Sequence, residues 1–211
     1  MKKTRCYIVG AGDFDESTLP KDDDFIIAAD GGLVYLHERG IEPDLIVGDF
    51  DSLPTKLADV VDKHPNVTRV SSIKDDTDMT LAVKEGLKLG YTEFAINGAL
   101  GGRLDQTYAN IQILTFITSQ GASATLYSRD NRITAIKDSS FTLNESNTKR
   151  KYISIFCAGD CAQGVTISGL LYPLENANII NSFPIGVSNE FTDKPAVISV
   201  KKGTLIIMWE K

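Results

Sequence analysis

The sequence predicts two domains: an α/β domain with a parallel, Rossmann-like sheet over residues 1–129, and an all-β sandwich domain over residues 130–211. In the first part, short and nearly continuous apolar runs alternate with helix-like segments, as expected of parallel strands buried on both faces. In the second part, short candidate strands follow one another without a helical pattern. Charge divides the chain at the same place, with 20 acidic and 13 basic residues before it and 8 acidic and 9 basic residues after it.

Six apolar runs are the predicted strands of the first domain: Cys6–Val9, Phe25–Ala29, Leu45–Val47, Val67–Val70, Phe94–Ile96 and Ala124–Tyr127. Two amphipathic stripes lie between later runs, at Met79–Leu87 and at Tyr108–Ile117, where apolar residues recur with the helical period. Strand–helix–strand repetition places helices on both faces of a parallel sheet.

Eight strands are predicted in the second domain: Ile133–Lys137, Ser140–Leu143, Tyr152–Phe156, Gln163–Ile167, Asn178–Asn181, Val187–Phe191, Ala196–Lys201 and Thr204–Trp209. Turn residues such as Ala158–Asp160 and Lys202–Gly203 separate them. This spacing is typical of a β-sandwich or a barrel, and we expect the sandwich.

Composition excludes several classes of protein. A hydrophobic content of 42% with 24% charged residues is that of a globular chain. An acidic chain without a Lys/Arg run does not suit nucleic-acid binding, and no apolar run approaches the roughly 18–20 residues of a membrane-spanning helix. The apolar stretch Cys6–Gly12 is too short for a signal peptide, and three cysteines do not build a disulfide framework, so we expect a cytoplasmic protein.

The strand Leu45–Val47 is followed by Gly48-Asp49-Phe50-Asp51. In a locally extended segment the two carboxylates would point the same way, at the sheet edge where α/β proteins bind ligands. Two convergent carboxylates favour a hard cation such as Mg²⁺. The alternative is a solvated turn with a helix cap.

A second acidic motif, Asp75-Asp76-Thr77-Asp78, precedes the helix that begins near Met79. Helix capping explains one or two of these residues. It does not explain three carboxylates within four positions, which repel one another unless a cation or hydrogen-bond donors lie nearby. We therefore expect Asp78 to be a third carboxylate at the same edge.

A third motif, Gly101-Gly102-Arg103-Leu104-Asp105, lies between a strand and a helix. Its glycines allow backbone N–H groups to approach a ligand, and Arg103 is a forked donor for phosphate oxygens. Asp105 either orients Arg103 or caps the helix. Asp30-Gly31 ends an earlier strand, and we favour a site role for Asp30 over a cap.

Other signals are weaker. Gly10-Ala11-Gly12 follows the first strand but lacks the third glycine of a dinucleotide-binding loop, so it receives no role. A further group of acidic residues is interpreted as solvated loop: Asp13, Asp15, Asp22, Asp23 and Asp24.

Carboxylates cannot hold a polyphosphate by themselves, but they can through Mg²⁺, which bridges carboxylate and phosphate oxygens. The motifs together predict metal-assisted phosphoryl or nucleotidyl-type transfer from ATP or another phosphate compound, with Arg103 neutralising charge. No P-loop (GxxxxGK[ST]) is present, so a P-loop kinase is excluded.

The set of motifs resembles the thiamine pyrophosphokinase family in order and spacing. The resemblance rests on Ala29–Gly32, Gly48–Ser52, Asp75–Asp78 and Gly101–Asp105, and in the second domain on Ser168–Leu174 and Ser188-Asn189. It implies transfer of the diphosphate of ATP to the hydroxyl of thiamine, giving thiamine diphosphate and AMP, in a homodimer with active sites at the subunit interface.

The resemblance also implies roles for single residues. Asp49, Asp51 and Asp78 match Mg²⁺-binding positions, and together with Arg103 and Asp105 they form the expected catalytic set. The expected ATP-binding residues are Asp30, Gly31, Thr77, Gly101, Gly102 and Arg103. Tyr172, Ser188 and Asn189 are the expected thiamine contacts, and an aromatic face suits the cationic thiazolium ring. For Tyr172, packing in the core is the alternative.

Two positions depart from the family pattern. Gln106 stands where the family often has His, so that position cannot titrate, and the proton acceptor is Asp78 or Asp105 in our hypothesis. Tyr172 stands where Trp is common. Two rival functions are a haloacid-dehalogenase-like phosphohydrolase, whose strand-end Asp-x-Asp resembles Asp49–Asp51, and a thiamine- or nucleotide-binding sensor without turnover.

Overall fold

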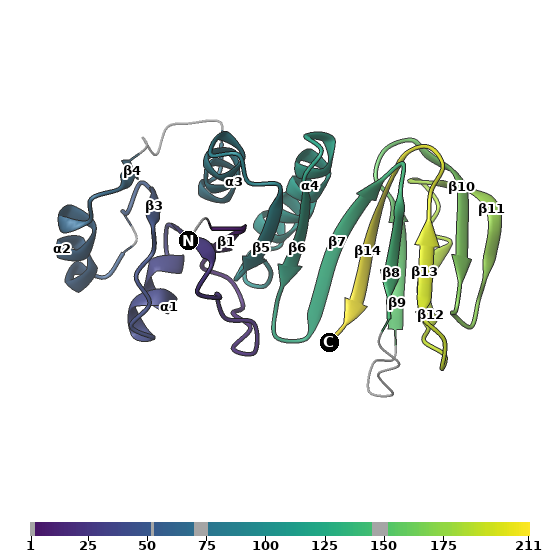
Figure 1. Cartoon of the computed structure of the whole chain (residues 1–211), viewed down its shortest axis with the longest axis horizontal. Coiled ribbons are helices and arrows are strands. Elements are labelled where there is room, and N and C mark those ends of the chain that lie inside the picture. The colour runs from purple at the N-terminus through teal and green to yellow at the C-terminus, as the bar shows by residue number, and fades with distance from the viewer. Residues whose placement is uncertain (1–2, 52, 70–75, 145–151) are drawn as a thin grey trace. The chain divides into compact units, whose positions relative to one another are not determined.

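The computed structural model describes residues 3–51, 53–69, 76–144 and 152–211 of the chain (Figure 1). It divides into two compact units. The first comprises residues 1–113 and 124–129, and the second comprises residues 114–123 and 130–211.

Each strand predicted for the first domain has a counterpart among the described residues, although Val70, the predicted end of the fourth, lies outside them. These strands are β1 Arg5–Val9, β2 Asp24–Ala29, β3 Leu45–Gly48, β4 Val67–Arg69, β5 Glu93–Asn97 and β6 Ser123–Tyr127. Their order in the sheet is β6-β5-β1-β2-β3-β4, and β1 pairs in parallel with both β2 and β5. β3 continues the parallel arrangement with β2 on one side and β4 on the other. Continuous apolar runs form these strands because both faces of the central ones are buried.

Four helices connect the strands: α1 Gly32–Glu38, α2 Thr55–Lys63, α3 Asp78–Lys88 and α4 Leu104–Ser119. The predicted stripe of α3 is buried at Met79, Ala82 and Val83. In α4 the prediction was wrong at Tyr108, which is 62% exposed, whereas Ile113 and Ile117 are buried. The helical period places Tyr108 near the buried stripe, but a periodic pattern does not show which turns of a helix are covered.

Two acidic residues interpreted as solvated loop are buried structural residues instead. Asp24 opens β2, is 1% exposed, and receives two hydrogen bonds from Arg5, at 2.9 Å from Nε and 2.7 Å from Nη2. Asp15 is 2% exposed. The sequence pattern missed both because a buried carboxylate is recognised only by its hydrogen-bond donors, which come from distant parts of the chain or from loop geometry.

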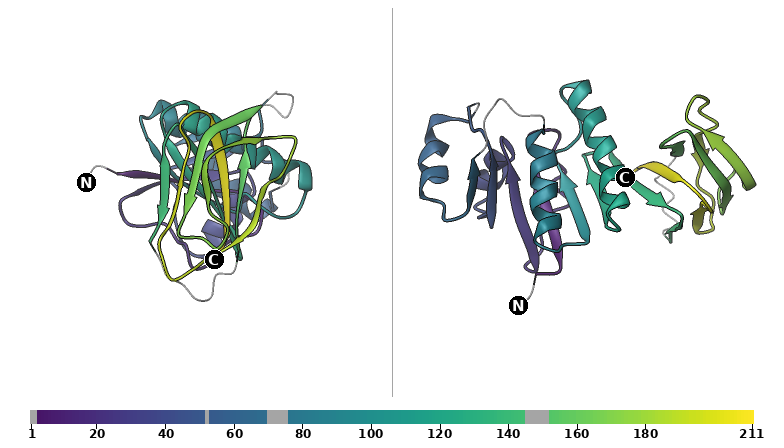
Figure 2. Two further views of the ribbon diagram at one scale, coloured as in Figure 1. Left: turned by 90° about the vertical axis from the view of Figure 1, so that its right-hand side faces the viewer. Right: turned by 90° about the horizontal axis from the view of Figure 1, so that it is seen from above.

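The second unit contains eight strands, as predicted. They are β7 Asn131–Lys137, β8 Ser140–Leu143, β9 Tyr152–Cys157, β10 Cys161–Ser168, β11 Leu174–Ile180, β12 Gly186–Glu190, β13 Ala196–Ser199 and β14 Thr204–Glu210. Figure 2 shows this β-rich unit, coloured green to yellow, from two further directions.

Two layers of antiparallel strands make up this unit, β12-β9-β14-β7 and β11-β10-β13-β8. They share one apolar core, to which β9 contributes Ile153 and Ile155 and β10 contributes Val165 and Ile167. Alternating burial along β9 and β14 is the expected pattern for strands with one face in such a core. The first layer belongs to a mixed sheet, because the same hydrogen-bonded sheet includes the parallel strands β1 to β5. The expectation of a purely parallel sheet was therefore too narrow.

Within the described part of the chain, no helix has the length and apolar character needed to cross a membrane. All three cysteines, Cys6, Cys157 and Cys161, are free thiols.

Candidate active site

A cleft of about 470 Å³ lies at the carboxyl ends of β1, β2 and β5, beside the first turns of α3 and α4. Of the residues predicted for the site, six line it: Asp30, Thr77, Asp78, Gly101, Gly102 and Arg103. Gly31, Asp49, Asp51 and Asp105 are not among the lining residues. The parallel topology explains the gathering, because strands of one direction end at one edge of the sheet.

The loop after β1 is part of the cleft, although the motif analysis predicts no role for it. Gly10, Ala11 and Gly12 all line the cavity. The Gly12 N–H donates to the Gly98 carbonyl at 2.7 Å, and a Cβ on Gly10 would lie 2.6 Å from that same oxygen. The glycines are therefore required for the close approach of two backbones. A Gly-x-Gly directly after a buried strand was the signal that could have identified this loop.

Asn97, the last residue of β5, fastens the loop that continues from Gly12. Its side chain is fully buried, and its Oδ1 accepts a hydrogen bond from the Asp15 N–H at 2.8 Å. Its Nδ2 lies 2.9 Å from the Tyr7 hydroxyl and 3.0 Å from the carbonyl oxygens of both Asp15 and Thr18. Tyr7 in turn donates to the Thr18 carbonyl, and burial raises the pKa of Tyr7 to about 12, so the hydroxyl keeps its proton. One amide thus joins β1, β5 and the loop.

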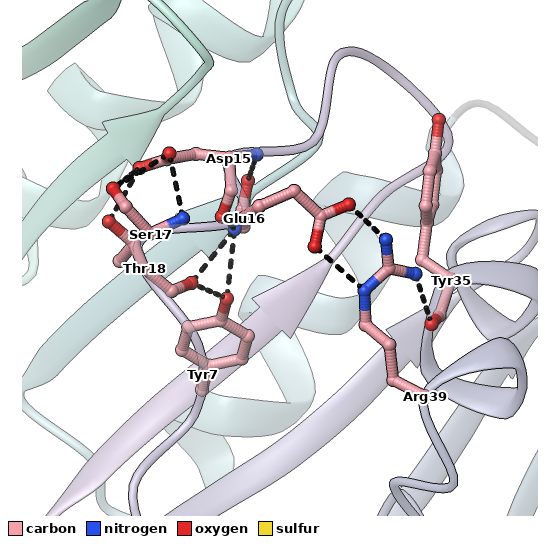
Figure 3. Close-up of polar contacts among 8 residues, drawn as sticks. Tyr7, Asp15, Glu16, Ser17, Thr18, Tyr35 and Arg39 are labelled. Carbon is pink, nitrogen blue, oxygen red and sulfur yellow. Dashed lines mark hydrogen bonds and ion pairs between the residues drawn. The ribbon is translucent and has the colours of Figure 1, made fainter.

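Figure 3 shows the polar contacts that Asp15 and Glu16 make in this loop. Asp15 accepts hydrogen bonds from the hydroxyls of Ser17, at 2.9 Å, and Thr18, at 2.6 Å. Glu16 turns the other way and pairs with Arg39, whose guanidinium lies 4.8 Å from the ring centre of Phe14. The hydrogen bonds that Arg39 donates to Glu16 raise the pKa of Arg39, which stays charged. The segment is therefore held by the Asp15 hydrogen bonds on one side and by the Glu16–Arg39 pair on the other.

Replacing Asn97 with Ala should destabilise the protein by about 2–4 kcal/mol, because several buried polar groups lose their partner at once. Urea denaturation monitored by circular dichroism would measure the change. Asn66→Ala is the matched control, because the Asn66 side chain is exposed and makes one bond to the Asp44 carbonyl, at 3.1 Å. Equal losses in the two variants would contradict the bracing role of Asn97.

The Asp49–Asp51 segment is a turn and not the extended segment that the sequence argument assumed. Phe50 has a φ of +64°, in the left-handed region, and the Asp51 N–H donates to Asp49 Oδ1 at 3.3 Å. A bulky residue in this region is strained and is retained only where its surroundings hold it. The Phe50 ring packs against the core of the first unit, and the Arg69 guanidinium lies 5.4 Å from its centre.

The described residues contain no group of three His, Cys, Asp or Glu side chains that could hold a metal ion. The predicted ligands Asp49, Asp51 and Asp78 therefore do not form a closed cage in this structure. Magnesium binding by these residues stays a prediction. Ser52 and Asp75, from the predicted motifs, lie outside the described residues.

The described residues of the second acidic motif have three different roles. Thr77 caps α3, with its Oγ1 accepting from the Thr80 N–H at 3.1 Å. Asp76 pairs with Lys84 at 2.6 Å. Asp78 begins the helix and lines the cleft. Capping and ion pairing thus account for the first two residues, and Asp78 is the carboxylate of the described motif that lines the cleft.

Arg103 and Asp105 form a two-bonded pair at the start of α4, with Nε–Oδ1 at 3.1 Å and Nη2–Oδ2 at 2.6 Å. This geometry is the predicted one in which Asp105 orients Arg103. The bonds from Arg103, and then that from the Gln106 N–H, lower the pKa of Asp105. Both side chains are largely exposed, so the pair positions a cation at the cleft and adds little stability.

In the second unit, Asn189 positions the backbone of Tyr172. Its Oδ1 accepts from the Tyr172 N–H at 2.9 Å, and its Nδ2 donates to the Tyr172 carbonyl at 2.7 Å. The Tyr172 side chain is 60% exposed, so the core-packing alternative does not hold. Ser188 has a φ of +57°, and its N–H donates to Ser154 Oγ at 3.0 Å. An aromatic ring is therefore held at the surface on a fixed backbone.

Comparison with known proteins gives consistent matches over both units. Residues 17–126 match the family model described as thiamin pyrophosphokinase, catalytic domain, and residues 139–205 match its vitamin B1 binding domain. A thiamine pyrophosphokinase of Bacillus subtilis (strain 168) is 30% identical over 183 residues, which are 86% of this chain and 85% of the relative.

Solved structures are similar over nearly the whole chain. The crystal structure of a thiamine pyrophosphokinase from Bacillus subtilis has a TM-score of 0.85 at 26% identity and covers 99% of both chains. That of a thiamin pyrophosphokinase from Geobacillus thermodenitrificans has a TM-score of 0.83 at 25% identity, covering 99% of this chain and 98% of its own. A thiamin pyrophosphokinase from Candida albicans, at 16% identity and a TM-score of 0.79, shares the fold over 99% of this chain and 89% of its own.

Proposed function

The chain belongs to the thiamine pyrophosphokinase family, and we propose that it transfers the diphosphate of ATP to the hydroxyl of thiamine, giving thiamine diphosphate and AMP. The observation that carries this proposal is the cleft in the segment matched by the catalytic model. There, Arg103 and two glycines meet Asp30 and Asp78 at one edge of the sheet.

ATP fits this cleft by the chemistry of its walls. The first turns of α3 and α4 carry the partial positive charge of a helix N-terminus, which favours an anion. Gly101 and Gly102 both have positive φ values, of +85° and +65°, and they let the backbone approach a phosphate closely. Arg103 adds a full positive charge at the same place, held in position by Asp105.

The acidic residues suit a polyphosphate that carries Mg²⁺. This ion is commonly bound through one or two carboxylates together with substrate phosphates, and not by an all-protein cage. Asp49 and Asp51, which are close in sequence at the end of β3, fit that donor set, and we assign Asp78 as the third carboxylate. When bound, magnesium would neutralise phosphate charge. Asp30, Gly31 and Thr77 complete the assigned ATP-binding residues.

In the proposed reaction the thiamine hydroxyl oxygen attacks the β-phosphorus of ATP in line. The bond between the β-phosphorus and the oxygen of the α-phosphate breaks, and AMP leaves with that oxygen. The hydroxyl proton passes to a nearby base. We keep Asp78 and Asp105 as the two candidates for this base.

We place thiamine against the second unit, with the Tyr172 ring facing its cationic thiazolium and with Ser188 beside it. Asn189 acts through Tyr172, because both ends of its amide are bonded to the Tyr172 backbone. A homodimer would bring this surface to the catalytic domain of a second subunit. An array of exposed apolar side chains in the second unit supports such an interface: Leu171, Tyr172, Ile180, Phe183, Ile185 and Val187. Free thiols agree with a cytoplasmic location.

Incubation of the protein with thiamine, ATP and Mg²⁺, followed by identification of both products, tests the proposal. We expect thiamine diphosphate and AMP in equal amounts, and none without thiamine. ADP would mean transfer of a single phosphoryl group. Phosphate released without thiamine would favour the phosphohydrolase, and binding of both substrates without product would favour the sensor.

A further inference from the structure

Asn110 is a buried polar residue in the wall of the cleft that no motif identified. It lies on α4, is 8% exposed, and is one of the residues that line the cavity. Its Nδ2 donates to the Ala99 carbonyl at 2.7 Å. This bond fixes which way the amide faces, because the reversed amide would place two oxygens against each other.

The other end of the amide has no such partner. Asn110 Oδ1 is buried and accepts no hydrogen bond from any residue that the structure describes. Most buried side-chain polar atoms have at least one hydrogen-bond partner, and an unsatisfied acceptor is costly to keep. Such an atom in the wall of a ligand cleft can accept a hydrogen bond from a donor group of the ligand.

The position of Asn110 along α4 indicates which part of the ligand could supply that donor. Arg103, Gln106 and Asn110 line the cleft in a single stripe at helical spacing. Asn110 follows Arg103, which directly precedes α4, by seven positions, and seven helical steps correspond to about 10 Å at roughly 1.5 Å per residue. A nucleotide with its phosphates at Arg103 extends its nucleoside part over this distance.

We propose that Asn110 Oδ1 accepts a hydrogen bond from the nucleoside part of ATP and thereby contributes to nucleotide specificity. The donor is an N–H or O–H group, either the exocyclic amine of adenine or a ribose hydroxyl. This assignment rests on the proposed function, which places ATP in the cleft. A nucleotide with only an acceptor atom at this point would bring that atom against Asn110 Oδ1 with no proton between the two, so it would be rejected.

In the wild-type protein, three analogues of ATP distinguish the candidate hydrogen-bond donors. Purine riboside triphosphate lacks the amine, and 2′-deoxy-ATP and 3′-deoxy-ATP each lack one hydroxyl. We expect kcat/KM to fall about tenfold for the analogue that lacks the bonded donor, and to change less for the other two. Calorimetric titration without thiamine should show the same loss of affinity. Equal use and equal binding of all four nucleotides would overturn the proposal.

The variant Asn110→Ala should lower kcat/KM for ATP about tenfold. It should leave kcat/KM unchanged for the analogue that lacks the bonded donor, so the preference for ATP over that analogue disappears. A uniform loss for all four nucleotides would mean that Asn110 only braces Ala99, and would overturn the proposal. Thr118→Val is the control, because it removes a hydrogen bond of 2.7 Å to the Leu114 carbonyl in the same helix, away from the cleft.

Two outcomes keep this inference separate from the proposed function. If the wild-type protein forms no thiamine diphosphate from ATP, the proposed function fails, and the calorimetric comparison of the four nucleotides still decides the role of Asn110. If Asn110→Ala does not fold, the discrimination by the wild-type protein decides it alone.

Discussion

Replacing Asp49 with Asn should lower kcat for thiamine diphosphate formation by about 100-fold or more, without unfolding the protein. Asp49 follows β3 directly, and its Oδ1 accepts the Asp51 N–H at 3.3 Å. An amide oxygen can accept the same bond, so the turn around Phe50 stays in place. What the substitution removes is a negative charge that we assign to the binding of magnesium with ATP.

The measurement is kcat and KM over a series of Mg²⁺ concentrations, together with the thermal unfolding midpoint of each variant. Asp22→Asn is the matched control, because Asp22 is exposed in the loop before β2 and lies outside the cleft. Near-normal turnover of Asp49→Asn would remove Asp49 from the metal site. If the unfolding midpoint of Asp49→Asn falls far enough to account for the lost activity, Asp49 instead has a structural role.

Much of the fold could be predicted from local pattern. The apolar runs at Cys6–Val9 and Leu45–Val47 correspond to β1 and β3 because short continuous apolar runs between turn residues are typical of strands buried on both faces. In the second unit, alternation at Tyr152–Phe156 identified β9 for the converse reason, since one of its faces meets the core. The position of Asp30, next to the end of β2, followed from these assignments through the topology rule.

What could not be predicted depended on conformation or on distant partners. The left-handed φ of Phe50 has no local signal, because glycine or asparagine is the usual residue there, so the relation between Asp49 and Asp51 was misjudged. The roles of Asp15 and Asn97 depend on each other across the sheet, and no window of sequence contains both. Gly12 was passed over because a motif of three glycines was expected, whereas the requirement is a close approach between two loops.

That close approach makes Gly12→Ala a strongly destabilising substitution, with an expected loss of about 2–4 kcal/mol. A Cβ on Gly12 would overlap the carbonyl oxygen of Leu100 and lie 2.8 Å from that of Gly98, and both are backbone atoms that cannot rotate away. The loops must separate, which breaks the bonds from Gly12 N–H to Gly98 and from Asp13 N–H to Leu100 and opens the cleft wall. ATP affinity should therefore fall with stability. Gly90→Ala is the comparison, because Gly90 has a φ of +88° and open space around it, so it should cost only about 1 kcal/mol. Urea denaturation and ATP titration of both variants measure the difference, and equal stability of the two would mean that the loops after β1 and β5 do not meet as described.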